Sequence, residues 1–596
     1  MIKCLFLLII LSISANAKQT ILVSAEKIER SENETTSSVV VIGEDEIEQS
    51  QTSTLTELIE NKSGLFVSSN GAYGKSSSLF LRGADSSFTL IIVDGVEYSD
   101  RSSVGGSSVL DHIDLSNVEK VEILKGSQSV LYGSDALAGV INITTKAPDG
   151  TSEALGSLSY GSYKNKRASF TAKNAGQRVN YTMGLSVQDV EGISSYNENR
   201  TVMAERDGYN NLTGSFKANT QISKKDLLQF SLRGVKAESD FDASTADKLD
   251  YVSRDSQIIS KVDYRYKVSD SWTPKLSVSH NKSDRLANSF SLSRLVSKIN
   301  KVELESPIEI NKNVTILNGL EYEKSKASID TIDNKKNFES SAVFIDTHIK
   351  VSKLKLHVGG RWTKESTYSD QLVWKVGALY PILRKTNLKV NASTGFKSPS
   401  LYQLYSNFGN ENLIPTKSES FDISLVQIIY SSRLELSYFT DSYDNIIDYD
   451  PLLSKYMNIS KSQNKGLEAN YYGEFKKLDW KLGATLLRAL NQSKGSEGKY
   501  LPRRPREKYN ISLGWKINQK IKFISEFNYV GKRENSDFDD VVLSSYGLFD
   551  FKFNYQFSKK DSLSFKLGNA LDKSYEQVYG YGTPGRNFML RWNFSL

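Results

Sequence analysis

The sequence predicts a transmembrane β-barrel of about 22 antiparallel strands, preceded by a compact α/β domain. Aromatic residues make up 11% of the 596 residues, with 31 Tyr and 26 Phe, although only 39% of the chain is hydrophobic. From about residue 151 onward, apolar and polar side chains alternate. After residue 17 no apolar run reaches about 18 residues, so membrane-crossing helices are not expected. This combination is typical of a wall in which every second side chain faces lipid.

The first residues have the pattern of a cleaved secretory signal. Lys3 precedes an apolar run from Leu5 to Ile13, and residues 15–17 (ANA) form a small-x-small cleavage motif. We therefore predict a signal peptide over residues 1–17. The single cysteine is Cys4, so we expect neither disulfides nor thiolate metal sites in the mature chain.

The residue pattern of the sequence changes at residues 146–150. Before this point, short segments rich in Val, Ile, Gly and Ser predict an α/β unit with strands at 88–93 and 118–124. After it, period-two alternation dominates, most clearly at 523–529 and 549–557. A soluble β-sandwich would alternate as well. The remaining length, however, allows about twenty residues per strand and turn for about twenty-two strands, which favours a large membrane barrel.

The last residues alternate to the end of the chain, with Phe588, Leu590, Trp592, Phe594 and Leu596 on one face. A membrane-embedded sheet cannot leave an edge of unpaired N–H and C=O groups. We therefore expect the final strand to close the barrel. The net charge of +7 is spread without a Lys/Arg block, so no nucleic-acid partner is expected.

Three ordered motifs precede the barrel region: 79–83 (LFLRG), 93–96 (VDGV) and 118–143 (VEKVEILKGSQSVLYGSDALAGVINI). They resemble the plug signatures of TonB-dependent outer-membrane receptors. The resemblance implies an N-terminal α/β plug domain inside the barrel lumen and a multi-pass β-barrel in the bacterial outer membrane. The expected domains are a signal peptide (1–17), a TonB box segment (18–30), a plug (31–148) and a β-barrel (149–596).

Within the plug, the glycines at 126, 133 and 139 are expected at tight turns and close backbone contacts, because a small domain must fit inside a barrel. Arg82 is a candidate to form an ion pair with Glu119 or Glu122 that holds the plug but can yield under force.

The segment after the predicted cleavage site is similar to the family's TonB box and comprises Thr20, Ile21, Leu22, Val23, Ser24 and Ala25. An extended, uncharged hexamer of this kind can add as a strand to the sheet edge of a partner. The resemblance identifies that partner as the TonB energy-transducing protein.

Four segments of the barrel region narrow the identity of the cargo. Residues 394–405 (TGFKSPSLYQLY) and 409–419 resemble the cobalamin and haem branches of the family, whereas 443–449 and 569–586 look most like the cobalamin branch. The predicted function is TonB-dependent active transport of a corrinoid. A ferric siderophore or haem receptor of the same fold is the alternative. Haem uptake usually needs a His or Tyr ligand to iron, and none of the four histidines lies in 394–419.

The resemblance also suggests the residues that contact the cargo. Candidates at the plug apices and the barrel rim are Ser76, Ser78, Asp85, Tyr98, Arg503 and Arg504. Hydroxyl and backbone groups suit the many amides of a corrinoid. The rim arginines could equally bind lipopolysaccharide phosphates.

The cobalamin branch uses calcium to order its extracellular loops, and carboxylates at comparable places here are Asp207, Asp240, Asp242 and Asp250. Oxygen clusters suit calcium, but solvated loop carboxylates explain the same residues. No covalent cofactor is expected.

The chain is not expected to be an enzyme, because no Ser/His/Asp constellation and no nucleotide-binding motif stand out. A passive porin or an adhesive barrel would leave residues 20–146 unexplained. The expected partners are TonB, cobalamin or another metal chelate, and outer-membrane lipid and lipopolysaccharide. A monomer is expected.

Overall fold

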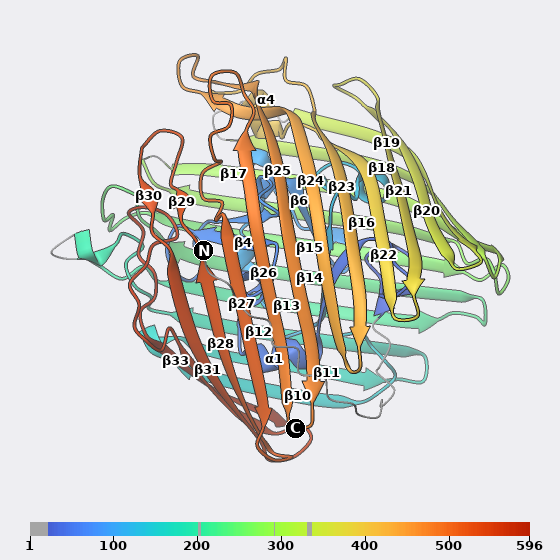
Figure 1. Cartoon of the computed structure of the whole chain (residues 1–596), viewed down its shortest axis with the longest axis horizontal. Coiled ribbons are helices and arrows are strands. Elements are labelled where there is room, and N and C mark those ends of the chain that lie inside the picture. The colour runs from blue at the N-terminus through green and yellow to red at the C-terminus, as the bar shows by residue number, and fades with distance from the viewer. Residues whose placement is uncertain (1–21, 201–203, 291, 330–335) are drawn as a thin grey trace.

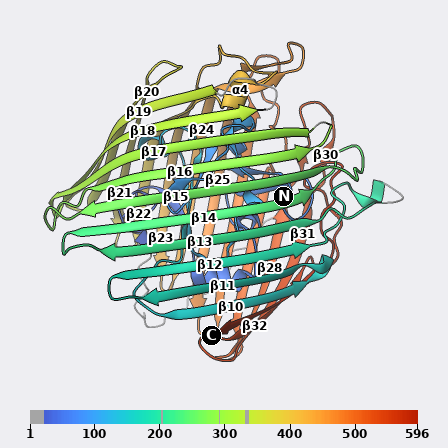
Figure 2. The same cartoon turned by 180° about the vertical axis from the view of Figure 1, so that it is seen from behind.

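A computed structural model describes residues 22–200, 204–290, 292–329 and 336–596. The predicted signal peptide and the first two residues of the predicted TonB box lie outside the described residues. The chain forms a closed β-barrel with a smaller α/β domain inside it. Figures 1 and 2 show barrel strands on both sides of this domain, which is drawn in blue.

Twenty-two antiparallel strands form the barrel in sequence order, as predicted. The first eleven are β10 (Glu153–Gly161), β11 (Lys166–Ala175), β12 (Val179–Val190), β13 (Tyr209–Gln221), β14 (Asp226–Asp240), β15 (Val252–Tyr266), β16 (Lys275–Asn288), β17 (Leu292–Asn311), β18 (Val314–Ile329), β19 (Lys336–Val351) and β20 (Leu354–Glu365). The others are β21 (Gln371–Leu383), β22 (Thr386–Lys397), β23 (Thr416–Ile429), β24 (Ser432–Asp450), β25 (Lys455–Phe475), β26 (Leu478–Asn491), β27 (Glu507–Lys516), β28 (Ile521–Val530), β31 (Tyr546–Gln556), β32 (Ser562–Gly568) and β33 (Asn587–Ser595).

The last strand closes the barrel against the first. β33 pairs antiparallel with β10, from Leu155 opposite Ser595 to Gly161 opposite Met589. This pairing satisfies the main-chain groups that an open edge would expose to lipid. The prediction of closure by the C-terminal strand is confirmed.

Alternation along each strand separates a lipid face from a lumen face. In β21, Leu372 and Trp374 are exposed, whereas Gln371, Val373 and Lys375 are buried toward the lumen. Period-two geometry makes this unavoidable, because successive side chains point to opposite faces of a sheet. Among the described residues, no helix has the length and apolar content needed to span a bilayer.

The two ends of the barrel differ. One end has short turns such as 312–313, 352–353 and 384–385, and the other has long segments such as 191–208, 398–415 and 569–586. Outer-membrane barrels have short periplasmic turns and longer extracellular loops, so the long segments mark the outer face. They carry η5 (Glu198–Arg200), α4 (Leu401–Tyr405), β29 (Arg533–Glu534) and β30 (Val542–Leu543), and η4 (Ser162–Lys164) lies in the short connection between β10 and β11. Figure 1 shows α4 at the end of the molecule opposite the C-terminus.

The inner domain, hereafter the plug, is built on a five-stranded sheet in the order β3-β8-β9-β6-β7. Its elements are β3 (Ser38–Gly43), α1 (Glu44–Ser50), α2 (Leu55–Glu60), β4 (Leu65–Ser69), β5 (Ser77–Leu81), η1 (Ser86–Phe88), β6 (Thr89–Val93), β7 (Val96–Glu97), η2 (Val104–Gly106), η3 (Leu110–His112), β8 (Val118–Lys125), α3 (Ser129–Tyr132) and β9 (Gly139–Thr145). A small hairpin of β1 (Leu22–Val23) and β2 (Arg30–Ser31) precedes it. Apolar side chains of α1, α2 and the sheet form its main core.

Two of the predicted plug glycines explain the tight fit inside the barrel. Gly133 has φ +75°, and a Cβ there would lie 2.9 Å from Nη2 of Arg361 on β20. A Cβ at Gly139 would lie 2.2 Å from the carbonyl oxygen of Leu124. Neither position tolerates a side chain without displacement of its neighbours.

Candidate functional site

Buried ion pairs fix the plug to one wall of the barrel. The Nη2 atom of Arg82, after β5, lies 2.8 Å from Oδ2 of Asp422 on β23, and its Nε lies 3.1 Å from Oε1 of Glu468 on β25. The other oxygen of Glu468 is 2.8 Å from Nζ of Lys125 on β8. Removing one member of such a group leaves an uncompensated buried charge, so this cluster strongly restrains the plug.

The predicted pairing of Arg82 with Glu119 or Glu122 is therefore wrong. Arg82 points out of the plug toward the barrel wall, where its guanidinium also lies 4.4 Å from the ring of Phe439. Glu119 accepts the backbone N–H of Ala147 at 3.3 Å. Glu122 binds the predicted TonB box instead.

The described part of the predicted TonB box is docked on the plug. The backbone N–H and the hydroxyl of Ser24 each donate to a carboxylate oxygen of Glu122, both at 2.7 Å. The hydroxyl of Tyr132 donates to the carbonyl of Ala25 at 2.8 Å, and Val23 is fully buried. The segment must leave these contacts before its main chain can pair with another protein.

Lys27 attaches the residues just after the box to the opposite wall. Its Nζ forms ion pairs with Glu303 and Glu305 of β17, the second at 3.1 Å. It also lies 5.2 Å from the ring centroid of Tyr132 on α3. Sequence reasoning gave no reason to select Lys27, because its partners are far along the chain.

A cavity of about 650 Å³ lies between part of the plug and the wall made by β13 to β18. It reaches the periplasmic turn between β15 and β16. Charged side chains of both signs line it, including Asp94, Lys217, Lys261, Asp263, Lys275 and Glu305. A polar space thus lies beside part of the plug, and direct contacts such as the ion pair of 2.6 Å between Asp94 Oδ1 and Lys217 Nζ still join the plug to this wall.

At the outer face the structure brings two predicted cargo residues together. Nη2 of Arg504, in the loop after β26, lies 3.7 Å from Oδ2 of Asp85 on the plug, and its Nε donates to the carbonyl of Gly83 at 3.3 Å. Its guanidinium stacks 4.2 Å from the ring centroid of Phe80. A plug apex and a barrel loop are therefore joined at this point.

The other residues predicted to contact the cargo differ in their exposure and in their contacts. Ser76 is exposed and Ser78 half-buried on the plug surface. Arg503 donates through Nε to the carbonyl of Asn535 at 3.2 Å. Tyr98 is only 3% exposed and packs in the main plug core. The Tyr98 side chain is therefore not presented to the outer face, because its residue continues the β6–β7 hairpin inward.

The predicted calcium ligands divide into two groups. Asp242 lies with Glu205 and Asp247, and their carboxylate oxygens are within 4.8 Å of one another. Asp207 accepts the backbone N–H of Ser195 at 2.5 Å, and Asp240 accepts that of Gly208 at 3.1 Å. Asp250, by contrast, is exposed and outside this group.

Two carboxyl groups in this loop region have raised pKa values. Burial, followed by the nearby Asp247, raises the pKa of Glu205 to about 7. Burial likewise raises the pKa of Asp207 to about 7, although Lys75 opposes the shift. Among the described residues, no donor reaches the carboxylate oxygens of Glu205. A cation here would relieve the repulsion.

Lys75 connects the plug to these loops and was missed by sequence reasoning. Its Nζ donates to the carbonyls of Asp207 and Gly208 at 3.3 and 3.2 Å and to Ser239 Oγ at 3.2 Å. Burial lowers its pKa to about 8. A lone lysine in a Ser-rich apex carries no sequence signal for such a role.

The four histidines do not gather at the outer face. His112 is buried in the plug against Tyr209, at 5.9 Å between ring centroids, and His280 pairs with Asn300 on the barrel. His348 and His357 face the lumen on β19 and β20.

Two family models match the chain. The model described as TonB-dependent receptor plug domain matches residues 31–140, and the model described as TonB dependent receptor-like, beta-barrel matches residues 158–570.

Among curated proteins, the chain is similar to the vitamin B12 transporter BtuB of Vibrio cholerae. The two are 26% identical over 610 aligned residues, which cover 98% of this chain and 96% of the relative. Whole-length coverage means that the similarity includes both plug and barrel.

Solved structures with a similar fold include siderophore receptors. The siderophore receptor PirA of Acinetobacter baumannii superposes with a TM-score of 0.82 at 17% identity, covering 94% of this chain and 98% of that one. A variant of the ferric enterobactin receptor PfeA of Pseudomonas aeruginosa gives 0.79 at 18% identity, covering 94% and 100%. The receptor Fiu of E. coli K12 gives 0.79 at 15%, covering 96% and 98%. At these identities the likeness concerns the fold alone.

Proposed function

The chain belongs to the TonB-dependent receptor family of outer-membrane transporters, and from this premise we propose that its cargo is a corrinoid such as cobalamin. The family consists of transporters and receptors rather than enzymes. The observation that carries the proposal is the similarity to a vitamin B12 transporter along almost the full length of both chains.

The charge at the outer face supports a neutral cargo. Arg504 is neutralised by Asp85 and also donates to main-chain carbonyls. An anionic ferric siderophore would need cationic groups that are free to pair with it, whereas corrinoid amides need hydrogen-bond donors and acceptors. Ser76, Ser78 and the Asp85–Arg504 pair supply these groups. Because Tyr98 is buried, we leave it out of the proposed site.

Calcium binding by the extracellular loops is part of this proposal. Glu205, Asp242 and Asp247 would hold the ion, since they bring several carboxylate oxygens together and no donor among the described residues reaches those of Glu205. Asp207 and Asp240 lie beside them and shape the loop through main-chain hydrogen bonds. The bound ion would order loops 191–208 and 241–251 over the plug.

Energy for uptake would come from a periplasmic partner of the TonB type. Residues 20–25 would add as a strand to the partner's sheet edge. The docking on Glu122 means that this addition requires release of Ser24. Traction on the released segment would then act on Lys27 and the plug.

Calorimetry with the purified, detergent-solubilised receptor tests the cargo. Cyanocobalamin is titrated with calcium and with chelator, and a ferric catecholate siderophore is titrated in parallel. Tight cyanocobalamin binding that weakens under chelator supports the proposal. Binding of the siderophore but not of cyanocobalamin would assign the receptor to a different metal chelate.

A further inference from the structure

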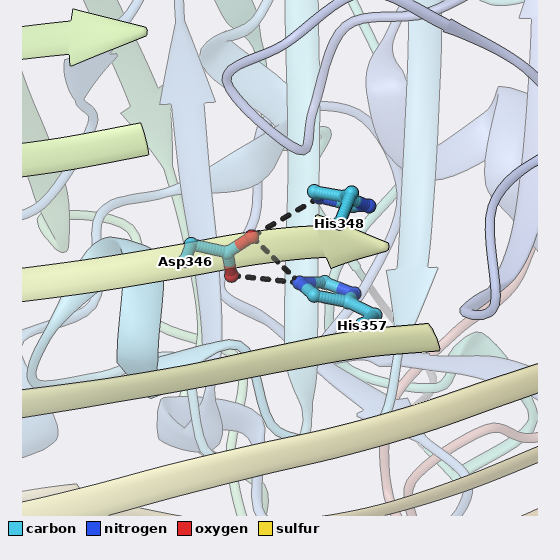
Figure 3. A group of neighbouring side chains, drawn as sticks. All are labelled: Asp346, His348 and His357. Atoms are coloured by element: carbon cyan, nitrogen blue, oxygen red, sulfur yellow. Dashed lines mark hydrogen bonds and ion pairs between the residues drawn. The ribbon is translucent and has the colours of Figure 1, made fainter. Parts of the chain in front are cut away.

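A group of three metal-ligating side chains lies in the barrel lumen near the periplasmic end. His348 on β19 is the direct cross-strand partner of His357 on β20, and Asp346 lies two residues before His348 on the same face. The turn at 352–353 joins the two strands. Figure 3 shows both imidazoles directed at the carboxylate of Asp346.

The donor atoms are close together. Nε2 of His357 is 2.7 Å from Oδ2 of Asp346, and Nε2 of His348 is 3.1 Å from Oδ1. The imidazole rings are stacked, with centroids 4.1 Å apart. One donor atom from each residue fits within a 4.8 Å group. Donors bound tetrahedrally to an ion at about 2.0–2.1 Å are roughly 3.3 Å apart, so a small outward shift suffices to admit an ion.

The surroundings of the group fit a metal site rather than a solvated patch. Asp346 is 1% exposed and His357 is fully buried. Nδ1 of His357 lies 3.4 Å from Oγ1 of Thr36 on the plug, so the ring nitrogen away from Asp346 also has a polar neighbour. Ligating histidines are usually oriented in this way by a second partner.

The charged groups around the three residues come from both plug and barrel. Glu26, Arg30 and Lys375 are the electrostatic neighbours of the histidines or of Asp346. Nζ of Lys375 donates to Ser37 Oγ and Gln128 Oε1, both at 2.9 Å. Glu26 is buried, and its Oε2 has no hydrogen-bond partner among the described residues. Glu26 and Asp346 supply the negative charge around the group, and Arg30 and Lys375 supply the positive charge.

We propose that Asp346, His348 and His357 form a binding site for a divalent transition-metal ion of the zinc class, separate from the cargo and calcium sites. Two imidazoles and one carboxylate are a donor set that Zn²⁺ accepts, with a fourth position left for water. Because Thr36 and Glu26 border the site, the ion braces the plug segment 35–37 against β19 and β20. This proposal does not depend on the identity of the cargo.

The test uses the full mature receptor, purified in detergent without a histidine tag. After treatment with chelator and dialysis, it is titrated with Zn²⁺, and bound metal is measured by elemental analysis. Co²⁺ serves as a second probe, because its visible absorption distinguishes a low-coordinate site with nitrogen ligands from hydrated ion. The variants are Asp346→Asn and the double variant His348→Ala/His357→Ala. His280→Ala and Asp250→Asn, which lie outside both carboxylate groups, are the matched controls.

We expect one tightly held equivalent of Zn²⁺ and strong visible Co²⁺ bands in the wild type and both controls. In the double variant the affinity should fall at least about tenfold. Zn²⁺ should also raise the unfolding midpoint of the wild type but not of this variant.

No stoichiometric uptake by the wild type, or equal uptake by a folded double variant, would overturn the proposal. Heat-modifiable electrophoresis checks that each barrel is folded. If the variants do not fold, the Co²⁺ spectrum of the wild type still decides, since a spectrum of hydrated Co²⁺ alone excludes the site.

Discussion

Ser24 and Glu122 are joined by two hydrogen bonds of 2.7 Å, one from the backbone N–H and one from the hydroxyl of Ser24. The carboxylate of Glu122 thus occupies a main-chain donor that a partner's sheet would need. The same carboxylate accepts from Asn142 Nδ2 at 2.8 Å, so it is held rigidly by the plug sheet. Release of the predicted TonB box therefore requires the loss of these hydrogen bonds to Glu122, together with the contact of Ala25 with Tyr132.

Glu122→Gln should favour the released TonB box. The amide keeps one acceptor but loses the charge, which should shift the docking equilibrium by about 1–3 kcal/mol, or roughly 5- to 150-fold. A spin label on Thr20→Cys would report a larger mobile fraction. Glu119→Gln, three residues away on the same strand, is the control. An unchanged spectrum for Glu122→Gln would show that Ser24 is held by other contacts.

Glu468→Gln should loosen the plug. It leaves Arg82 and Lys125 buried with less compensating charge, which typically costs about 3–5 kcal/mol. Pulse proteolysis across a urea series should detect plug cleavage at lower urea than in the wild type. Glu474→Gln lies on the same strand but is exposed, and it should leave the urea midpoint unchanged. Equal midpoints for both variants would contradict a locking role for Glu468.

Calcium affinity should rise with pH. The pKa values of Glu205 and Asp207 are raised to about 7, mainly by burial, so both carboxyls hold protons in weak acid, and the proton on the proposed ligand Glu205 competes with calcium. Without calcium, the folded loops lose stability as pH rises from about 4 to about 7, because the folded state binds protons that the unfolded state has released. Calcium titrations near pH 5.5 and pH 8 should give tighter binding at the higher pH.

A substitution tests whether calcium binds to the carboxylates of these loops. Asp242→Asn should weaken calcium binding at least about tenfold, which corresponds to about 1.4 kcal/mol. Asp250→Asn, on the same loop but outside the carboxylate group, should bind calcium as the wild type does. If Asp250→Asn has the larger effect, the ion lies elsewhere in the loop.

Arg504→Ala should weaken cyanocobalamin binding about tenfold. It removes the stack on Phe80 and leaves Asp85 unpaired at the plug apex. Arg506→Ala, which loses the pair with Glu534 and a stack on Tyr500 but no contact with the plug apex, serves as the control in the same calorimetric titration. Heat-modifiable electrophoresis checks that both variants are folded.

The barrel was predictable because its signal is local. Alternation needs only neighbouring residues, and the alternation from Phe588 to Trp592 indicated a closing strand without knowledge of its partner. The partner of Arg82 was not predictable, since Glu468 lies far along the chain. Period two could have placed Glu468 on the lumen face, but it carries no information about which plug residue faces it.

The loops were predicted less well because no periodicity constrains them. Asp242 was selected together with Asp250, yet the chain turns so that Asp247 and Glu205 face Asp242 instead. Tyr98 was assigned to an apex, although its backbone N–H pairs with the carbonyl of Ile91 and its ring enters the core. Side-chain direction in such segments depends on packing that only the folded chain supplies.

Lys27 is two residues from the end of the predicted TonB box, and its ion pairs to Glu303 and Glu305 are the first ion pairs with the barrel along the described part of the chain. A force that pulls on the predicted TonB box would therefore not act on all the ion pairs between plug and barrel at once. The force would break these ion pairs one after another, as in peeling, starting with those of Lys27 and reaching the deeper ones of Arg82 and Lys125 later. Peeling requires a small sustained force where simultaneous rupture would require a large one.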